Sequence, residues 1–127
     1  MHSKPGTILI VDDVPENLTI LTSMLNQRGY LVRPAINGQI ALKAVQKDVP
    51  DLILLDIMMP YMSGYEVCKQ LKTDARTRDI PVIFISALHE IFEKMKGFEV
   101  GGVDYITKPF QEQEVIARIE IHLTLRN

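Results

Sequence analysis

Three runs of four consecutive apolar residues constrain the fold of this chain more than any other feature. The runs are Ile8-Leu9-Ile10-Val11, Leu52-Ile53-Leu54-Leu55 and Val82-Ile83-Phe84-Ile85. Short unbroken apolar runs are typical of parallel strands that helices cover on both faces of a sheet. We therefore expect three central strands, at Thr7–Val11, Asp51–Leu55 and Pro81–Ile85.

Two weaker segments complete the predicted sheet. Tyr30–Ala35 contains Arg33 and Pro34, and the short segment Val103–Ile106 contains Asp104. Proline and charged residues are typical of edge strands, because one side of an edge strand is unpaired. The expected strand order is 2-1-3-4-5, that of a flavodoxin-like, doubly wound α/β fold with five parallel strands and five helices.

The segments between the first three strands have the apolar spacing of amphipathic helices. The first places Leu18, Leu21 and Leu25 on one face. We expect it to stop at Gly29, because glycine tolerates the left-handed conformation that ends many helices. The second helix should begin near Asn37. Further residues expected to face the sheet from these two helices are Ile20, Met24, Ile40, Ala44 and either Leu42 or Val45.

Three more helices are predicted in the second half of the chain. The third covers Gly64–Asp74 and the last covers Gln111–Leu125. Gly97 and the Gly101-Gly102 pair make the fourth the weakest prediction, because glycine disfavours a helix interior. The residues expected to be buried are Val67, Cys68, Leu71, Ile91, Met95, Phe98, Val115, Ile116, Ile119 and Leu123. Ile121 and Leu125 lie beside the last apolar stripe and are candidates for a dimer contact.

Length and composition indicate one soluble domain. The 127 residues fit a domain predicted at residues 7–126, with residues 1–6 as a disordered lead-in. The single cysteine, Cys68, excludes an internal disulfide and fits a reducing compartment. The net charge of −2 and the scattered basic residues argue against direct nucleic-acid binding. No apolar run approaches the roughly 20 residues that span a membrane. We therefore expect a cytoplasmic protein that contacts no membrane.

Three carboxylates follow the first and third predicted strands. Asp12 and Asp13 come directly after the first strand, and Asp56 comes directly after the third. In an open parallel sheet, ligands bind beyond the carboxyl ends of the strands, where the strand order reverses. Like charges about 4 Å apart repel by roughly 4 kcal/mol at an effective dielectric of 20, so a proton or a hard cation should accompany them. Mg²⁺ accepts such ligands, and a carboxylate can act as a nucleophile toward phosphorus.

Two further polar residues end the neighbouring strands. Ser86 follows the fourth strand and supplies a hydroxyl group, and Lys108 follows the fifth strand and supplies a flexible cation. Phosphoryl transfer depends mostly on positioning and on neutralising oxygen charge. The five side chains at this rim therefore favour phosphoryl chemistry.

Each of these residues also has a simpler interpretation. Asp13 taken alone is as well explained as the cap of the first helix, and Ser86 as a turn residue. Lys108 alone would be a solvated lysine, and Asp56 alone an ordinary acid at a strand end. Cys68 is expected in the core, and the three histidines are too dispersed for a metal site and are expected at the surface: His2, His89 and His122.

Along nearly its whole length, from Thr7 to Arg126, the sequence resembles the receiver domains of response regulators in two-component signal transduction. Four blocks in this order and spacing carry the resemblance: Ile8-Leu9-Ile10-Val11-Asp12-Asp13, Asp56-Ile57-Met58-Met59-Pro60-Tyr61-Met62-Ser63-Gly64, Pro81-Val82-Ile83-Phe84-Ile85-Ser86-Ala87 and Asp104-Tyr105-Ile106-Thr107-Lys108-Pro109-Phe110.

The resemblance implies a role for each residue of the rim. Asp56 would accept the phosphoryl group, and Mg²⁺ would be bound by Asp12, Asp13, Asp56 and the backbone carbonyl of Met58. Lys108 and Ser86 would contact the phosphoryl group, and the Lys108-Pro109 bond would be cis. Tyr105 would be the aromatic switch residue, which turns inward when Ser86 moves.

The resemblance further implies a phosphorelay switch rather than an enzyme with an external substrate, although such a domain catalyses its own phosphorylation and dephosphorylation. A sensor histidine kinase or a phosphotransfer protein would be its partner. Phosphorylation would alter the face formed by the fourth helix, the fifth strand and the last helix, for an output domain or a homodimer. Two alternatives remain open: an interaction module that needs no phosphorylation, and a phosphatase with an aspartate nucleophile.

Overall fold

The computed structural model describes residues 6–87 and 91–126 and contains one sheet of five parallel strands with five helices. The strand order is β2-β1-β3-β4-β5, so the predicted flavodoxin-like fold is confirmed. The strands are β1 (Thr7–Val11), β2 (Leu31–Ala35), β3 (Leu52–Asp56), β4 (Val82–Ser86) and β5 (Asp104–Thr107). The helices are α1 (Pro15–Asn26), α2 (Gly38–Lys47), α3 (Gly64–Lys72), α4 (Ile91–Glu99) and α5 (Glu112–Arg126).

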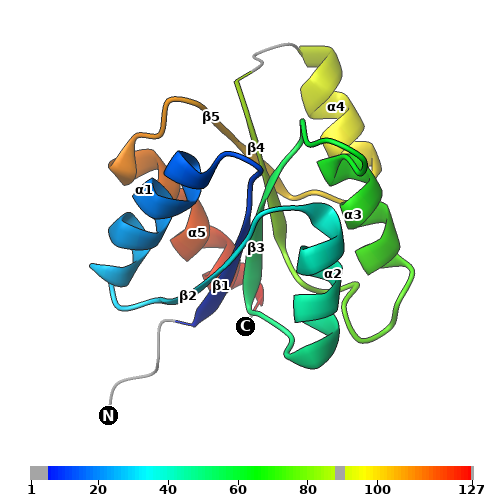
Figure 1. The fold of residues 1–127 in the computed structure, drawn as a ribbon, viewed down its shortest axis with the longest axis horizontal. Coiled ribbons are helices and arrows are strands. Elements are labelled where there is room, and N and C mark those ends of the chain that lie inside the picture. Colours follow the sequence, from blue (N-terminus) through cyan, green and yellow to red (C-terminus); the bar gives the residue numbers. More distant parts are fainter. Residues whose placement is uncertain (1–5, 88–90, 127) are drawn as a thin grey trace.

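The helices form a layer on each face of the sheet. Helices α1 and α5 cover one face, and α2, α3 and α4 cover the other (Figure 1). Side chains alternate along each strand, so one apolar run contributes to both layers. In β1, Ile8 and Ile10 pack with the α1 and α5 layer, whereas Leu9 and Val11 pack with the opposite layer. This two-sided burial explains why the central strands contain unbroken apolar runs.

Much of the predicted core is buried, four positions are exposed, and four more are partly buried against the core: Leu18, Met24, Ala44 and Leu123. Leu21, Leu25, Val67, Cys68, Leu71, Val115, Ile116 and Ile119 are buried as expected. Ile20, Ile40, Met95 and Phe98 are exposed instead, so their predicted burial is wrong. In α2 the buried positions are Gly38, Ala41 and Val45. The side chain of Ile91 lies outside the described residues.

In the described part of α4, Gly97 lies against the sheet, whereas Met95 and Phe98 are exposed. A Cβ atom at Gly97 would lie 2.9 Å from the ring of Phe84, and one at Gly102 would lie 2.4 Å from the same ring. Phe84 is fully buried and also contacts Tyr65, at 5.4 Å between ring centroids. The glycines that weakened the prediction of this helix therefore make room for an aromatic ring.

Gly29 has the predicted role at the end of α1. Its φ angle is 88°, in the left-handed region that glycine tolerates, and it follows the last turn of the helix. Tyr30 N then donates to the Leu25 carbonyl, which ties the chain to the helix end before β2 begins. In the described part of the chain, no helix has the length and apolarity that crossing a membrane requires.

Candidate functional site

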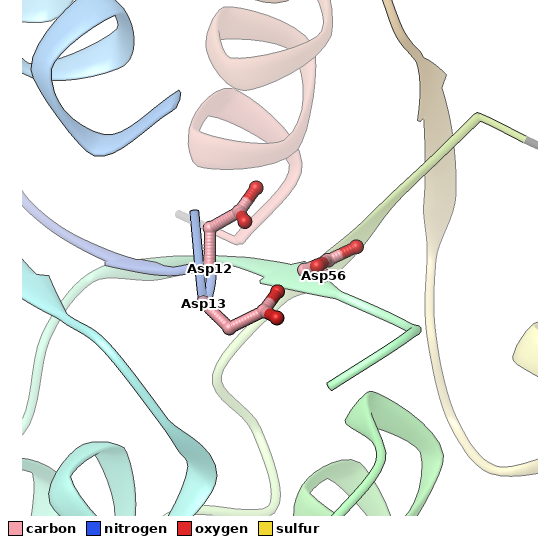
Figure 2. Close-up of side chains that lie close together, drawn as sticks. All are labelled: Asp12, Asp13 and Asp56. Carbon is pink, nitrogen blue, oxygen red and sulfur yellow. The ribbon is translucent and has the colours of Figure 1, made fainter. Parts of the chain in front are cut away.

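The carboxyl ends of β1 and β3 bring three acidic side chains together. Asp12 and Asp13 follow β1, and Asp56 is the last residue of β3 (Figure 2). Val11 pairs with Leu55 in the sheet, so the residues that follow them lie side by side. One carboxylate oxygen of each aspartate lies within 4.8 Å of the others. The convergence predicted from the sequence is present in the structure.

Asp12 is fully buried, and local hydrogen bonds fix its carboxylate. Its Oδ1 accepts from the backbone N–H of Val14, at 2.9 Å, and its Oδ2 accepts from Asn17 Nδ2, at 3.1 Å. The N-cap residue of α1 is Val14, so the alternative that Asp13 caps this helix is wrong. Pro15 begins the helix, as is common, because the first helical N–H needs no partner within the helix.

Lys108 supplies a cation that both buried aspartates share. Its Nζ lies 3.4 Å from Asp12 Oδ2 and 3.5 Å from Asp56 Oδ1. The backbone N–H of Lys108 donates to the Ser86 carbonyl, at 2.9 Å, so the end of β4 positions this lysine. The Lys108-Pro109 bond is cis, as the resemblance implies. Lys108 is therefore part of the acidic site and not a solvated lysine.

The electrostatics of the site show an excess of negative charge. The pKa of the Asp56 carboxyl is raised from its usual 3.8 to about 7. Burial is the largest cause, and the negative charge of Asp12 is the next. Lys108 opposes the shift, and Asp13 adds to it. One lysine therefore does not compensate the three carboxylates, and the arrangement favours a proton or a further cation.

A divalent cation fits this donor set. Carboxylate oxygens from three residues converge on one small volume, and hard cations such as Mg²⁺ prefer oxygen ligands. The raised pKa of Asp56, caused first by burial and then by the charge of Asp12, shows that its charged form would gain from a nearby cation. The resemblance assigns the ligand role of Met58 to its backbone carbonyl, and the side chain of this residue is exposed.

Ser86 and Tyr105, the predicted phosphoryl contact and the predicted switch residue, lie on the neighbouring strands β4 and β5. Ser86 is buried at the end of β4, two residues after Phe84 and therefore on the same face of the sheet. Tyr105 is 7% exposed and its ring centroid lies 6.4 Å from that of Phe84. The ring of the predicted switch residue is thus turned inward in this structure.

Two residues of the site were not predicted from the sequence. Asn17 donates a hydrogen bond to Asp12. This contact could have been predicted, because the third residue of a helix can face the residues just before the helix. Gly64 packs against the end of β3, where an added Cβ would lie 2.2 Å from the Asp56 carbonyl oxygen. The sequence indicates this position through Ser63, which caps α3 in a capping box with Glu66 and so makes Gly64 the first residue of the helix.

His122, which we expect at the surface, is only partly exposed and pairs with Asp104. Its side chain is 13% exposed, and Nε2 lies 2.8 Å from Asp104 Oδ2. Arg118 Nη1 lies 2.8 Å from the other oxygen of Asp104. Although burial disfavours the charged form of Asp104, its hydrogen bonds to His122, Tyr105 N and Arg118 hold the pKa of this carboxyl below its usual value. His2 and His89 lie outside the described residues.

Comparisons with known proteins agree with this geometry. A family model described as the response regulator receiver domain matches residues 8–120. Response regulator PleD of Caulobacter vibrioides is 43% identical over 112 residues, which are 88% of this chain and 25% of PleD. The alkaline phosphatase synthesis transcriptional regulatory protein PhoP of Bacillus subtilis is 43% identical over 113 residues, which are 89% of this chain and 46% of PhoP. The chain thus spans less than half the length of these relatives.

Solved structures agree with the same assignment. The receiver domain of the Francisella response regulator 1452 superposes with a TM-score of 0.88 at 30% sequence identity. The superposition covers 96% of this chain and 99% of that domain.

Proposed function

The chain belongs to the response regulator receiver domain family, and on that premise we propose that it is a signalling switch whose phospho-acceptor is Asp56. The observation that carries the proposal is the site at the ends of β1 and β3. There a buried carboxylate lies beside two other acids and a shared lysine. We further propose that the domain spans residues 7–126, that residues 1–6 are a disordered lead-in, and that the protein is cytoplasmic.

The proposed reaction is nucleophilic displacement at phosphorus. A carboxylate oxygen of Asp56 forms a bond to phosphorus, and the bond from phosphorus to the donor breaks. The donor is a phosphohistidine of a sensor kinase or of a phosphotransfer protein, or a small acyl phosphate. The donor fragment leaves with the electron pair of the broken bond. The product is an aspartyl phosphate, and hydrolysis of that bond restores the carboxylate.

The chain's own residues prepare the carboxylate for this step. Burial of Asp56 removes competing water, and Lys108 Nζ at 3.5 Å offsets the charge that accumulates on the oxygen atoms. Ser86, at the end of the adjacent strand, would donate its hydroxyl to the phosphoryl group. Asp12, Asp13, Asp56 and the Met58 carbonyl would bind Mg²⁺, which when bound neutralises phosphoryl oxygen charge.

Phosphorylation would reach the surface through β4 and β5. The phosphoryl group would draw Ser86 toward it and favour the inward position of Tyr105 seen here, on the strand that α4 and α5 flank. Exposed apolar residues on those two helices include Met95, Phe98, Ile121 and Leu125. They suit a face that binds an output domain or a second copy of the chain. Shifting such a switch from about 1% to 99% active takes roughly 5.5 kcal/mol.

Labelling with acetyl phosphate tests this function. We expect one covalent phosphoryl adduct on the wild-type protein, dependent on Mg²⁺ and labile in base, and its loss in Asp56→Asn. Intact-mass spectrometry measures both. The exposed acid Asp79 provides the control, and Asp79→Asn should be labelled like the wild type. A protein that never gains the adduct would instead be an interaction module independent of phosphorylation, and turnover of an external phosphoester would favour the phosphatase alternative.

A further inference from the structure

The buried carboxylate of Asp12 has two different partners on one oxygen. Oδ2 accepts from Asn17 Nδ2 at 3.1 Å and also lies 3.4 Å from Lys108 Nζ. An ionised carboxylate only accepts hydrogen bonds, so the Asn17 amide must present its nitrogen to it. Asp12 therefore has one neutral donor and one cationic partner on the same side of its carboxylate.

The two partners differ in how firmly they are held. Asn17 is the third residue of α1, and its backbone N–H donates to the Val14 carbonyl at 3.0 Å. The helix thus holds the backbone of Asn17, so its short side chain needs little freedom to reach Asp12. Lys108 is a long, flexible side chain on another segment, and it divides its contacts between Asp12 and Asp56.

A phosphoryl group on Asp56 would change this division. It adds negative charge at Asp56 and so draws the Lys108 ammonium toward itself, away from Asp12. Asp12 is 0% exposed, so water cannot readily replace the lost partner. Mg²⁺ bound by Asp12 would contact the carboxylate but would donate no hydrogen bond to it. The Asn17 amide is therefore the hydrogen-bond donor that remains on Oδ2, and it fixes the orientation of the carboxylate.

We propose that Asn17 is a positioning residue that holds the Asp12 carboxylate in place when Lys108 moves to the phosphorylated Asp56. This inference rests on the proposed function. In this proposal Asn17 does not contact the phosphoryl group. Asn17 acts through Asp12 and contributes most in the phosphorylated state, because Lys108 still faces Asp12 in the unmodified protein.

Beryllofluoride, which imitates the phosphoryl group without covalent turnover, separates the two states. The dissociation constants to measure are those for Mg²⁺ alone and for beryllofluoride at saturating Mg²⁺, by NMR titration of backbone amides. For Asn17→Leu we expect the constant for beryllofluoride to rise about tenfold, equivalent to about 1.4 kcal/mol. The constant for Mg²⁺ alone should change by no more than about twofold. Asn17→Gln, which keeps the donor, should recover most of the loss.

Asn26→Leu is the matched control, because Asn26 is an exposed residue at the other end of α1. It should bind both ligands like the wild type. The inference is overturned if Asn17→Leu binds beryllofluoride like the wild type. It is also overturned if this variant loses affinity for both ligands equally along with thermal stability, because that pattern indicates a structural role only. Failure of the wild-type protein to bind beryllofluoride would instead contradict the proposed function.

Discussion

Gly64→Ala is expected to lower the free energy of unfolding by about 2 to 4 kcal/mol, because the added methyl group meets backbone atoms that cannot rotate away. The new Cβ would lie 2.2 Å from the Asp56 carbonyl oxygen and 3.0 Å from Ile57 Cα. The N–H of Gly64 also donates to the Ile57 carbonyl at 2.9 Å, so moving α3 away breaks this bond. Urea denaturation measures the effect.

The same substitution should weaken the site as well as the fold. Relief of the contact shifts the end of β3, and Asp56 is the last residue of that strand. We therefore expect slower labelling by acetyl phosphate at a temperature where the variant is still folded. Gly38→Ala is the control, because the three atoms nearest to its new Cβ belong to the side chains of Val67 and Met62 and not to backbone, the nearest at 2.7 Å. A Gly64→Ala protein as stable as Gly38→Ala would contradict this packing.

Asp56→Asn is expected to raise the free energy of unfolding by about 2 to 4 kcal/mol at pH 8 without divalent cations, since one pKa unit corresponds to about 1.4 kcal/mol. The pKa of Asp56 is raised in the folded protein from 3.8 to about 7. Between these values the folded state binds more protons than the unfolded state, so the stability of the wild type falls as the pH rises through this window. Above pH 7 the full cost of the charged carboxylate is present, and the amide avoids it.

Chemical denaturation of both proteins from pH 3.5 to pH 8.5 measures this effect. The difference in the free energy of unfolding between Asp56→Asn and the wild type should be greatest above pH 7. It should be small near pH 3.5, where the Asp56 carboxyl is largely protonated in the folded and the unfolded state. Saturating Mg²⁺ should reduce the difference in the free energy of unfolding at pH 8, because a bound cation offsets more repulsion in the wild type, with three carboxylates, than in the variant, with two. Asp79→Asn controls for a general effect of net charge. A difference that does not vary with pH would mean that the shifted pKa is not its cause.

The strands and the convergent acids could be predicted from the sequence because their signals are local and geometric. An apolar run such as Leu52-Ile53-Leu54-Leu55 is typical of a strand buried on both faces, and parallel strands place their carboxyl ends on one edge of the sheet. Asp12, Asp13 and Asp56 follow from those two facts. Their convergence needed no knowledge of side-chain orientation, because the order of the strands places them together.

Helix orientation and long-range polar contacts could not be predicted in the same way. Ile20 and Ile40 are apolar residues next to the buried stripe, and a small rotation of the helix decides whether such a residue is covered. Met95 and Phe98 are exposed because Gly97, not a large residue, packs on Phe84. His122 is covered because it contacts Asp104, 18 residues earlier, and no local pattern contains that pairing.

A crystal structure of the protein with magnesium and beryllofluoride tests the central claim most directly. We expect beryllofluoride on the Asp56 carboxylate, a metal ion between that group and the acids that follow β1, and the Lys108 ammonium moved toward the fluoride atoms. If the acidic site at the ends of β1 and β3 held neither ligand at saturating magnesium and beryllofluoride, the proposal that Asp56 is the phospho-acceptor would be contradicted.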